Sequence, residues 1–210
     1  MTGPSAAPAR PLVLASTSRY RKALLHRLGL PFDALDPGVD EDRYKLEALQ
    51  PDQLVATLAL EKARACAAQR PGAVVVGGDQ CAEIDGETLG KPGSVDQAVA
   101  QLSRLRGRTH RLLTAVCVID GASGRELVHV DEHRLTLRML SDAQLRSYVE
   151  LDRPLDCAGS YKIESLGIAL FERIDGHDAT AITGLPLMKL TEMLLQVGID
   201  VLSVERAQRS

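Results

Sequence analysis

A change of pattern along the chain constrains the fold more than any other feature: strands and helices alternate at first, and two long strands then follow each other. Short apolar runs at residues 11–15 and 73–76 are typical of buried strands, and helical segments at residues 19–28 and 52–69 lie beside them. Residues 111–138 fit two long strands joined by a turn. The sequence therefore predicts an α/β fold with a mixed β-sheet flanked by helices.

Side chains that cap helices indicate where further elements begin. Ser94 with Gln97, and Ser141 with Gln144, have the spacing of a capping box, so each pair predicts the start of a helix. Residues 167–174 have the pattern of a strand. These elements extend the predicted α/β pattern into the second half of the chain.

The length of the chain, 210 residues, suits one α/β domain or two small lobes that share a cleft. Residues 1–10 are rich in Pro, Ala and Gly, and we expect them to form a disordered tail. Pro186 predicts the start of a last helix. We therefore expect a single domain over residues 11–210.

The charge balance argues against binding to nucleic acid or to an anionic membrane. There are 25 Lys and Arg against 28 Asp and Glu, which gives a formal net charge of -3. Charges interrupt every apolar run before the roughly 20 residues that a spanning helix needs. The N-terminal segment lacks the apolar core of a signal peptide. We expect a cytoplasmic protein in which any phosphate binding comes from a local cluster of cations.

The cysteines and histidines do not form a pattern that predicts zinc. Cys66, Cys81, Cys117 and Cys157 are far apart and include no CxxC pair, so we interpret them as reduced and mostly buried. Two of the histidines lie four residues apart in a predicted strand, where that spacing separates side chains by roughly 13 Å. That distance is too great for one zinc ion.

Four segments carry residue types suited to phosphate chemistry. The turn at residues 16–22 joins hydroxyls and cations to a helix N-terminus, which is a local anion site. Asp79 follows a buried strand and two glycines, small residues that we expect to let a ligand approach. Residues 36–42 hold four acids, whose hard oxygens suit magnesium or manganese, and Lys91 lies between Gly and Pro. Each segment alone also fits a structural role, as a capped helix, a turn or a solvated acidic loop.

Two common enzyme signatures are absent from the sequence. It contains no Gly-x-x-x-x-Gly-Lys-Ser/Thr loop, and it contains no Gly-x-Ser-x-Gly elbow. The sequence therefore does not support a Walker-type nucleotide site or a serine hydrolase built on such an elbow.

A series of short motifs runs along the chain in a fixed order. They are Leu-Ala-Ser-Thr-Ser at 14–18 with Arg21, Val-Asp-Glu at 39–41, Glu-Lys-Ala at 61–63, Gly-Asp-Gln at 78–80, Gly-Lys-Pro at 90–92, Ala-Gly-Ser-Tyr-Lys at 158–162 and Gly-Leu-Pro at 184–186. No single motif is specific by itself, but taken in order they resemble those of the Maf-like nucleoside triphosphate pyrophosphatases. The resemblance covers residues 12–197, nearly the whole chain.

The resemblance implies two lobes around a deep nucleotide-binding cleft, a homodimer, and cleavage between the α- and β-phosphates. It implies phosphate binding by Ser16 and Arg21. It also implies a catalytic set of Asp79, Glu41, Lys62 and Lys91. In this set Asp79 is the proton acceptor, and Asp79 and Glu41 organise metal or water. Lys62 and Lys91 contact phosphate. The implied cofactor is a divalent cation, Mg²⁺, Mn²⁺ or Co²⁺, as phosphoryl chemistry commonly requires.

Within this family, Tyr20, Gln80 and Glu164 resemble the branch that acts on 7-methyl-GTP. Guanine presents two donors side by side, and a carboxylate at Glu164 can accept both. Methylation at N7 makes the purine cationic, and an aromatic ring at Tyr20 could stack on it with a gain of roughly 0.5–2 kcal/mol. The resemblance therefore implies hydrolysis of 7-methyl-GTP to 7-methyl-GMP and diphosphate, in a role that keeps modified nucleotides out of nucleic acid.

Three positions depart from the family pattern. Arg19 stands where proline is usual, Gly77-Gly78 replaces a more usual Gly-Ser, and Ser165 follows Glu164 where this branch usually has glycine. The last departure predicts a tighter pocket or a shifted base preference. Two alternatives stay open from the residues: the same reaction on UTP, dTTP or CTP, and a non-catalytic nucleotide-binding regulator of cell division.

Overall fold

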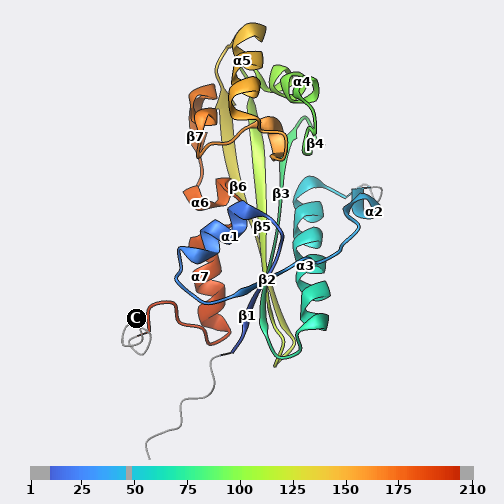
Figure 1. The fold of residues 1–210 in the computed structure, drawn as a ribbon, viewed down its shortest axis with the longest axis vertical. Coiled ribbons are helices and arrows are strands. Elements are labelled where there is room, and N and C mark those ends of the chain that lie inside the picture. The colour runs from blue at the N-terminus through green and yellow to red at the C-terminus, as the bar shows by residue number, and fades with distance from the viewer. Residues whose placement is uncertain (1–9, 46–48, 204–210) are drawn as a thin grey trace, which may run out of the picture.

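The structure is a computed structural model that describes residues 10–45 and 49–203, so nine of the ten residues of the expected tail lie outside the described residues. The described residues form one sheet of seven strands in the order β2-β1-β3-β5-β6-β7, with β4 paired to β3 (Figure 1). The strands are β1 (Leu12–Ala15), β2 (Asp33–Leu35), β3 (Val74–Ile84), β4 (Glu87–Leu89), β5 (Thr109–Asp120), β6 (Arg125–Leu137) and β7 (Phe171–Asp175).

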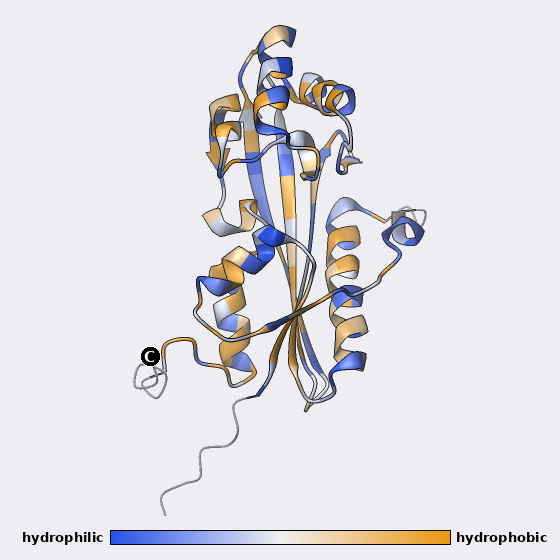
Figure 2. Cartoon of the chain, in the orientation of Figure 1, coloured by the Kyte–Doolittle hydropathy of each residue, from blue (hydrophilic) through white to orange (hydrophobic). Residues whose placement is uncertain are grey.

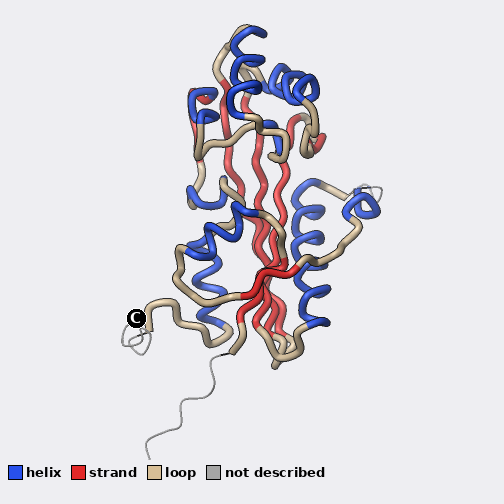
Figure 3. Tube along the Cα trace, in the orientation of Figure 1, coloured by secondary structure: helices blue, strands red, loops and turns tan. Residues whose placement is uncertain are grey.

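The sheet is mixed, as the sequence predicts. β1 pairs in parallel with β2 and β3, whereas the pairs β3–β5, β5–β6 and β6–β7 are antiparallel. Figure 3 shows β3, β5 and β6 running nearly the whole length of the sheet. These three strands therefore belong to both halves of the molecule.

Helices cover the sheet in two groups and divide the molecule into two lobes (Figure 1). In the lower lobe, α3 covers one face, and α1 and α7 cover the other. In the upper lobe, α4, α5 and the 3-10 segments pack beside the far ends of the long strands. The helices are α1 (Arg19–His26), α2 (Glu41–Lys45), α3 (Pro51–Gln69), α4 (Val95–Leu105), α5 (Asp142–Asp152), α6 (Ala179–Ile182), α7 (Leu187–Gln196), η1 (Ala158–Ser160) and η2 (Leu166–Leu170).

Three clusters of buried apolar side chains hold these layers together. One joins α1 and α7 to the sheet, a second joins α3 to the opposite face, and the third fills the upper lobe between α4, α5 and the long strands. In Figure 2 the orange, apolar positions gather on the central strands and on the helices beside them. Burial of these side chains supplies the main favourable term for folding.

The predicted helix starts at Ser94 and Ser141 are confirmed. The hydroxyl of Ser94 accepts from the backbone N–H of Gln97, and Ser141 and Gln144 form a complete capping box. The predicted hairpin is β5 and β6, and the last helix, α7, follows Pro186.

Two sequence predictions about strands are wrong in part. Residues 77–80 were predicted to follow the strand, but β3 continues through them, because β5 pairs with β3 along its length, including Gly77 with Cys117. The strand predicted at 167–174 begins only at Phe171, and residues 166–170 form the 3-10 segment η2, whose last residue is buried.

Within the described part of the chain, no helix combines the length and the apolar character needed to cross a membrane. Cys66, Cys81 and Cys117 are buried and free, and Cys157 is partly buried, as the sequence predicts. Burial raises the pKa of Cys81 and of Cys117 to about 12. These thiols are therefore packing residues rather than nucleophiles.

Candidate active site

The predicted site residues lie together in one cleft of about 830 Å³ between the two lobes. Its walls come from the β1–α1 turn, the loop before α2, α3, β3, the loop after β4 and the segment between α5 and η2. All the positions named from the sequence line this cleft, namely Ser16, Tyr20, Arg21, Glu41, Lys62, Asp79, Gln80, Lys91 and Glu164.

The centre of the cleft is an ion cluster around Lys62. Its Nζ lies 2.7 Å from Oδ1 of Asp79 and 2.5 Å from Oε1 of Glu41. Lys62 and Asp79 are buried, at 7% and 8% exposure, whereas Glu41 is half-exposed. A buried charge needs a partner, so each buried member of the cluster stabilises the other.

Close packing of α3 on β3 brings Lys62 and Asp79 together. A Cβ at Gly77 would lie 2.2 Å from the carbonyl oxygen of Ala59, so only glycine permits this approach of helix to strand. From the sequence, the two glycines were expected to make room for a ligand. At Gly77 that interpretation is wrong, because the room is filled by the backbone of α3.

Arg21 lies beside the cluster and is held by the backbone at the end of α6. Its Nε donates to the carbonyl of Gly184 at 3.1 Å, and the remaining N–H groups have no hydrogen-bond partner within the described residues. A Cβ at Gly78 would lie 3.3 Å from this Nε, so glycine there leaves Arg21 its place against the sheet. The free N–H groups remain available to an anion.

Burial shifts the acid–base properties of the two groups at the cleft floor. Loss of solvation raises the pKa of Asp79 above its ordinary value, and the charges of Lys62 and Arg21 oppose that rise. Loss of solvation also lowers the pKa of Arg21, against the charges of Asp79 and Glu41. A carboxylate with a raised pKa is a stronger base than an ordinary one, as a group that accepts a proton during a reaction must be.

The start of α1 forms the anion-binding side of the cleft. The hydroxyl of Ser18 accepts from the backbone N–H of Arg21 and caps the helix. Ser16 is buried at 6% exposure, and its hydroxyl accepts from the N–H of Ser18 at 3.1 Å. The predicted helix N-terminus, with hydroxyls and a basic first turn, is thus present at the cleft wall.

Among the four acids of residues 36–42, only Asp36 and Glu41 line the cleft. The side chain of Asp36 accepts from the N–H of Gly38 at 3.0 Å, and that of Asp40 accepts from the N–H of Asp42 at 3.2 Å. Asp36 and Asp40 therefore shape the local turn. Glu41 is the member of this segment that joins the ion cluster.

The amide of Gln80 is occupied by the protein itself. Its Nε2 donates to Oγ1 of Thr114 at 2.8 Å and to the carbonyls of Ala181 and Ile182 at 3.0 and 3.1 Å. Turning the amide over would set its oxygen against two carbonyl oxygens, so this orientation is fixed. Gln80 presents only its carbonyl oxygen to a ligand.

Tyr20 stands at the mouth of the cleft with Arg19 across its ring. The guanidinium carbon of Arg19 lies 4.7 Å from the ring centroid, and Nη2 donates to the phenol oxygen at 2.6 Å. The phenol oxygen also lies 3.8 Å from Sγ of Cys157 in the upper lobe. Burial raises the pKa of Tyr20 to about 12 and that of Cys157 to about 11, so both groups stay protonated at neutral pH.

Glu164 is exposed on the upper wall, on a loop anchored to α5. Nζ of Lys162 donates to the carbonyls of Asp152 and Arg153 at 2.6 and 3.0 Å, and Ser165 donates to Oδ1 of Asp152 at 2.5 Å. Ser165 does not line the cleft, so the prediction that it tightens the pocket is wrong. Its hydroxyl instead ties the loop to α5.

Lys91 lies on the loop after β4, on the upper side of the cleft, and its side chain is exposed. The structure thus brings the predicted cations to the cleft from different elements: Arg21 from α1, Lys62 from α3 and Lys91 from this loop. An anion bound between the lobes would therefore meet cations from more than one side.

The donor set fits a metal only in part. No group of three or more His, Cys, Asp or Glu with metal-binding geometry is found among the residues that the structure describes. Asp79 and Glu41 can supply two carboxylates, and magnesium in enzymes is commonly held by one or two carboxylates together with substrate phosphates. Because both acids already pair with Lys62, a cation would fit best when phosphate accompanies it.

Two features of the site were not predicted from the sequence. The carbonyl of Gly184 holds Arg21, and the hydroxyl of Thr114 contacts Gln80 and α6 from behind the cleft wall. The sequence signal for the first was the Gly-Leu-Pro motif at 184–186, which carried no assigned role. Thr114, a polar residue between the apolar Leu113 and Ala115, gave no signal.

Fold and site together define a two-lobed α/β protein whose cleft offers a helix N-terminus, cations and a buried carboxylate to an anionic ligand. The chain belongs to the family of Maf-like proteins, whose family model matches residues 11–197. That range covers nearly all of the described structure.

Curated relatives of similar length support this membership. The chain is 47% identical over 193 residues to a protein of Albidiferax ferrireducens named 7-methyl-GTP pyrophosphatase, covering 92% of this chain and 96% of the relative. It is 49% identical over 190 residues to a protein of the same name from Xanthomonas oryzae pv. oryzae, covering 90% and 98%. Among solved structures, a HAM1 protein from Coxiella burnetii covers 63% of this chain and 75% of its own, with 14% identity and a TM-score of 0.45.

Proposed function

We propose that this protein hydrolyses 7-methyl-GTP to 7-methyl-GMP and diphosphate. The observation that carries the proposal is the buried Asp79 carboxylate, held 2.7 Å from Nζ of Lys62 in a cleft that also contains Arg21. Anhydride hydrolysis needs cations for developing charge and a base for water, and this cluster offers both. The names of the relatives support the same reaction and the same nucleotide.

In the proposed reaction, Asp79 accepts a proton from the water that attacks the α-phosphate. Its raised pKa brings the carboxylate closer to the basicity that a general base needs at neutral pH. Ser16, the start of α1 and the free N–H groups of Arg21 bind the phosphates, and Lys62 and Lys91 offset their charge. The bond that breaks joins the α-phosphorus to the bridging oxygen, and diphosphate leaves with that oxygen.

The base preference is proposed to come from the upper wall and the mouth of the cleft. Glu164 accepts the two adjacent donors of guanine, which uracil and thymine do not offer side by side. The ring of Tyr20 stacks on the cationic methylated purine. Gln80 contributes its carbonyl oxygen, because its amide hydrogens are already donated to Thr114 and α6.

We propose a divalent cation, Mg²⁺, Mn²⁺ or Co²⁺, as the cofactor, held by Asp79 and Glu41 together with substrate phosphate. When bound, such an ion would polarise the phosphoryl oxygens. Treatment with EDTA should abolish turnover, and each of these ions in excess should restore it. Full activity in EDTA would contradict the proposed metal cofactor.

A single substitution separates catalysis from binding. Asp79→Asn keeps the size of the side chain but removes its basicity, so diphosphate release should fall by about a hundredfold or more. Nucleotide affinity, measured by calorimetry, should change far less. The matched control is Asp175→Asn on β7, whose carboxylate pairs with Arg173 outside the cleft. Unchanged turnover in Asp79→Asn would contradict the proposal and favour a non-catalytic nucleotide-binding role.

We further propose that the protein acts in the cytoplasm as a homodimer on free nucleotides, without binding nucleic acid or membrane. The net charge of -3 favours small nucleotides over polyanionic chains as ligands. Light scattering coupled to gel filtration tests the dimer directly, because a mass near that of one chain would contradict it.

A further inference from the structure

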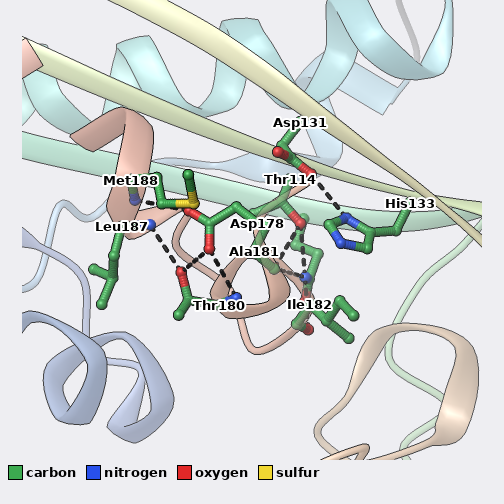
Figure 4. A network of polar contacts seen from close by, with 10 residues as sticks. Thr114, Asp131, His133, Asp178, Thr180, Ala181, Ile182, Leu187 and Met188 are labelled. Carbon is green, nitrogen blue, oxygen red and sulfur yellow. Dashed lines mark hydrogen bonds and ion pairs between the residues drawn. The ribbon is translucent and has the colours of Figure 1, made fainter. Parts of the chain in front are cut away.

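A buried polar network lies behind the cleft wall, where α6 packs against β5 and β6 (Figure 4). Thr114 lies on β5 at 1% exposure, and Leu112, Leu113, Ala115 and Val116 around it are also buried. A buried hydroxyl in such a row costs free energy unless it is hydrogen-bonded. Thr114 does not line the cleft, so its hydroxyl has no direct path to a substrate.

The hydroxyl of Thr114 makes two hydrogen bonds, one to α6 directly and one to Gln80 on β3, whose amide also donates to α6. It donates to the carbonyl of Ala181 at 3.0 Å and accepts from Nε2 of Gln80 at 2.8 Å. The same amide nitrogen donates to the carbonyls of Ala181 and Ile182. Thr114 and Gln80 thus hold the two last carbonyls of this short helix against the sheet.

The carbonyl of Ala181 also fixes the next turn of the backbone. It accepts from the N–H of Gly184 at 2.9 Å, and the carbonyl of Gly184 accepts from Nε of Arg21 at 3.1 Å. Gly184 has φ of 121°, a conformation that side chains disfavour. The position of Arg21 therefore depends on the position of Ala181, which Thr114 sets.

The other end of α6 is fixed in a similar way. The carboxylate of Asp178 accepts from the N–H and the hydroxyl of Thr180, at 2.9 and 2.6 Å, and from the N–H of Met188 at 2.7 Å. The hydroxyl of Thr180 accepts in turn from the N–H of Leu187 (Figure 4). Asp178 joins α6 to the start of α7, so α6 is held from both sides.

We propose that Thr114 is a positioning residue for triphosphate binding, which acts on Arg21 through the carbonyls of Ala181 and Gly184. The inference rests on the phosphate-binding role proposed for Arg21. Thr114 would thus affect substrate binding although it does not line the cleft. Small displacements of a charge that binds substrate are costly, since a misplacement of about 1 Å can lower a rate by about a hundredfold.

The test is a double-mutant cycle between Thr114→Val and Arg21→Ala, read by the affinity for inorganic triphosphate. Calorimetry of this binding needs no turnover, so it stays informative even if the proposed hydrolysis fails. Valine keeps the shape of threonine without the hydroxyl. In the unsubstituted protein, Thr114→Val should weaken the affinity for inorganic triphosphate by about tenfold. In the Arg21→Ala background, the same substitution should weaken it by less than about twofold.

Two further variants guard against a purely structural explanation. Thr114→Ser retains the hydroxyl and should restore affinity to within about twofold of the original protein. Thr180→Val loosens α6 from its other side and should show the same dependence on Arg21, even if Thr114→Val does not fold. Equal losses with and without Arg21, or unchanged affinity in folded Thr114→Val, would overturn the inference. Failure of the unsubstituted protein to bind inorganic triphosphate would also overturn it.

Discussion

Lys62 shows how single residues set the electrostatics of the cleft. Its ammonium lies between Asp79 from β3 and Glu41 from α2, and it is almost fully buried. In water such a contact is worth little, but removing one partner of a buried pair costs about 3–5 kcal/mol. The cluster therefore keeps Asp79 in place before substrate arrives. In the proposed reaction, phosphate would then compete for Lys62, and the proposed metal would compete for the two carboxylates.

Glu164 offers a test of base selection at the residue scale. Glu164→Gln exchanges two acceptors for an acceptor beside a donor, so it should lower the preference for 7-methyl-GTP over UTP by about tenfold. The measurement is the ratio of kcat/KM for the two nucleotides. Glu172→Gln, an exposed position on β7, is the matched control. An unchanged ratio would show that Glu164 does not face the base.

How far a side chain could be predicted depended on how local its environment is. The helix cap at Ser18 and the basic first turn follow from neighbouring residues. By contrast, the amide of Gln80 turns toward carbonyls 101 and 102 residues away, and Ser165 turns toward Asp152. Such contacts depend on tertiary packing, which residue spacing does not reveal.

At the scale of elements, most helices and strands were predictable because their signals are local. Capping and apolar spacing placed α4, α5 and α7 to within a residue or two at their starts. The full length of β3 was not predictable, because the pair Gly77-Gly78 has the signature of a turn. Pairing with β5 and contact with α3 override that local preference.

The same glycine gives a prediction about element packing. In Gly77→Ala the new Cβ would meet the carbonyl of Ala59, so α3 must shift and the protein should lose about 1–3 kcal/mol of unfolding free energy. Urea denaturation measures this loss. Gly90→Ala is the control, because a Cβ there meets no atom within 4 Å. Equal stability of the two variants would contradict the packing argument.

At the scale of the whole molecule, the two lobes share one continuous sheet. The register of β3 with β5 runs unbroken from Val74 opposite Asp120 to Glu83 opposite Arg111. Opening or closing of the cleft must therefore come from the loops and short helices at its walls, because the shared strands resist bending between the lobes. Sequence patterning predicted both halves of this sheet but not their continuity, since only the long-range pairing of β3 reveals it.

Burial of a histidine makes global stability depend on pH. His110 packs against Tyr161 and Phe171 in the upper lobe at 2% exposure, and loss of solvation lowers its pKa from 6.5 to about 4. The unfolded chain therefore takes up a proton at a higher pH than the folded protein does. The contribution of His110 to the free energy of unfolding is therefore fully present above pH 6.5. It should be lost, by about 3 kcal/mol, as the pH drops toward 4.

Substitution of His110 provides the check on this pH dependence. His110→Gln should flatten the part of the stability curve between pH 6.5 and 4, measured as the urea midpoint across that range. His177→Gln, at an exposed position, should leave the curve unchanged. If the slope survives in His110→Gln, other groups cause it.

The central claim is tested most directly by diphosphate release from the purified protein with magnesium, across 7-methyl-GTP, GTP, UTP, dTTP and CTP at equal concentration. We predict the highest kcat/KM for 7-methyl-GTP, because the roles proposed for Glu164 and Tyr20 favour a cationic purine. Highest activity on UTP, dTTP or CTP would contradict the base preference but retain the reaction. No release from any of the five nucleotides would contradict the proposed function itself.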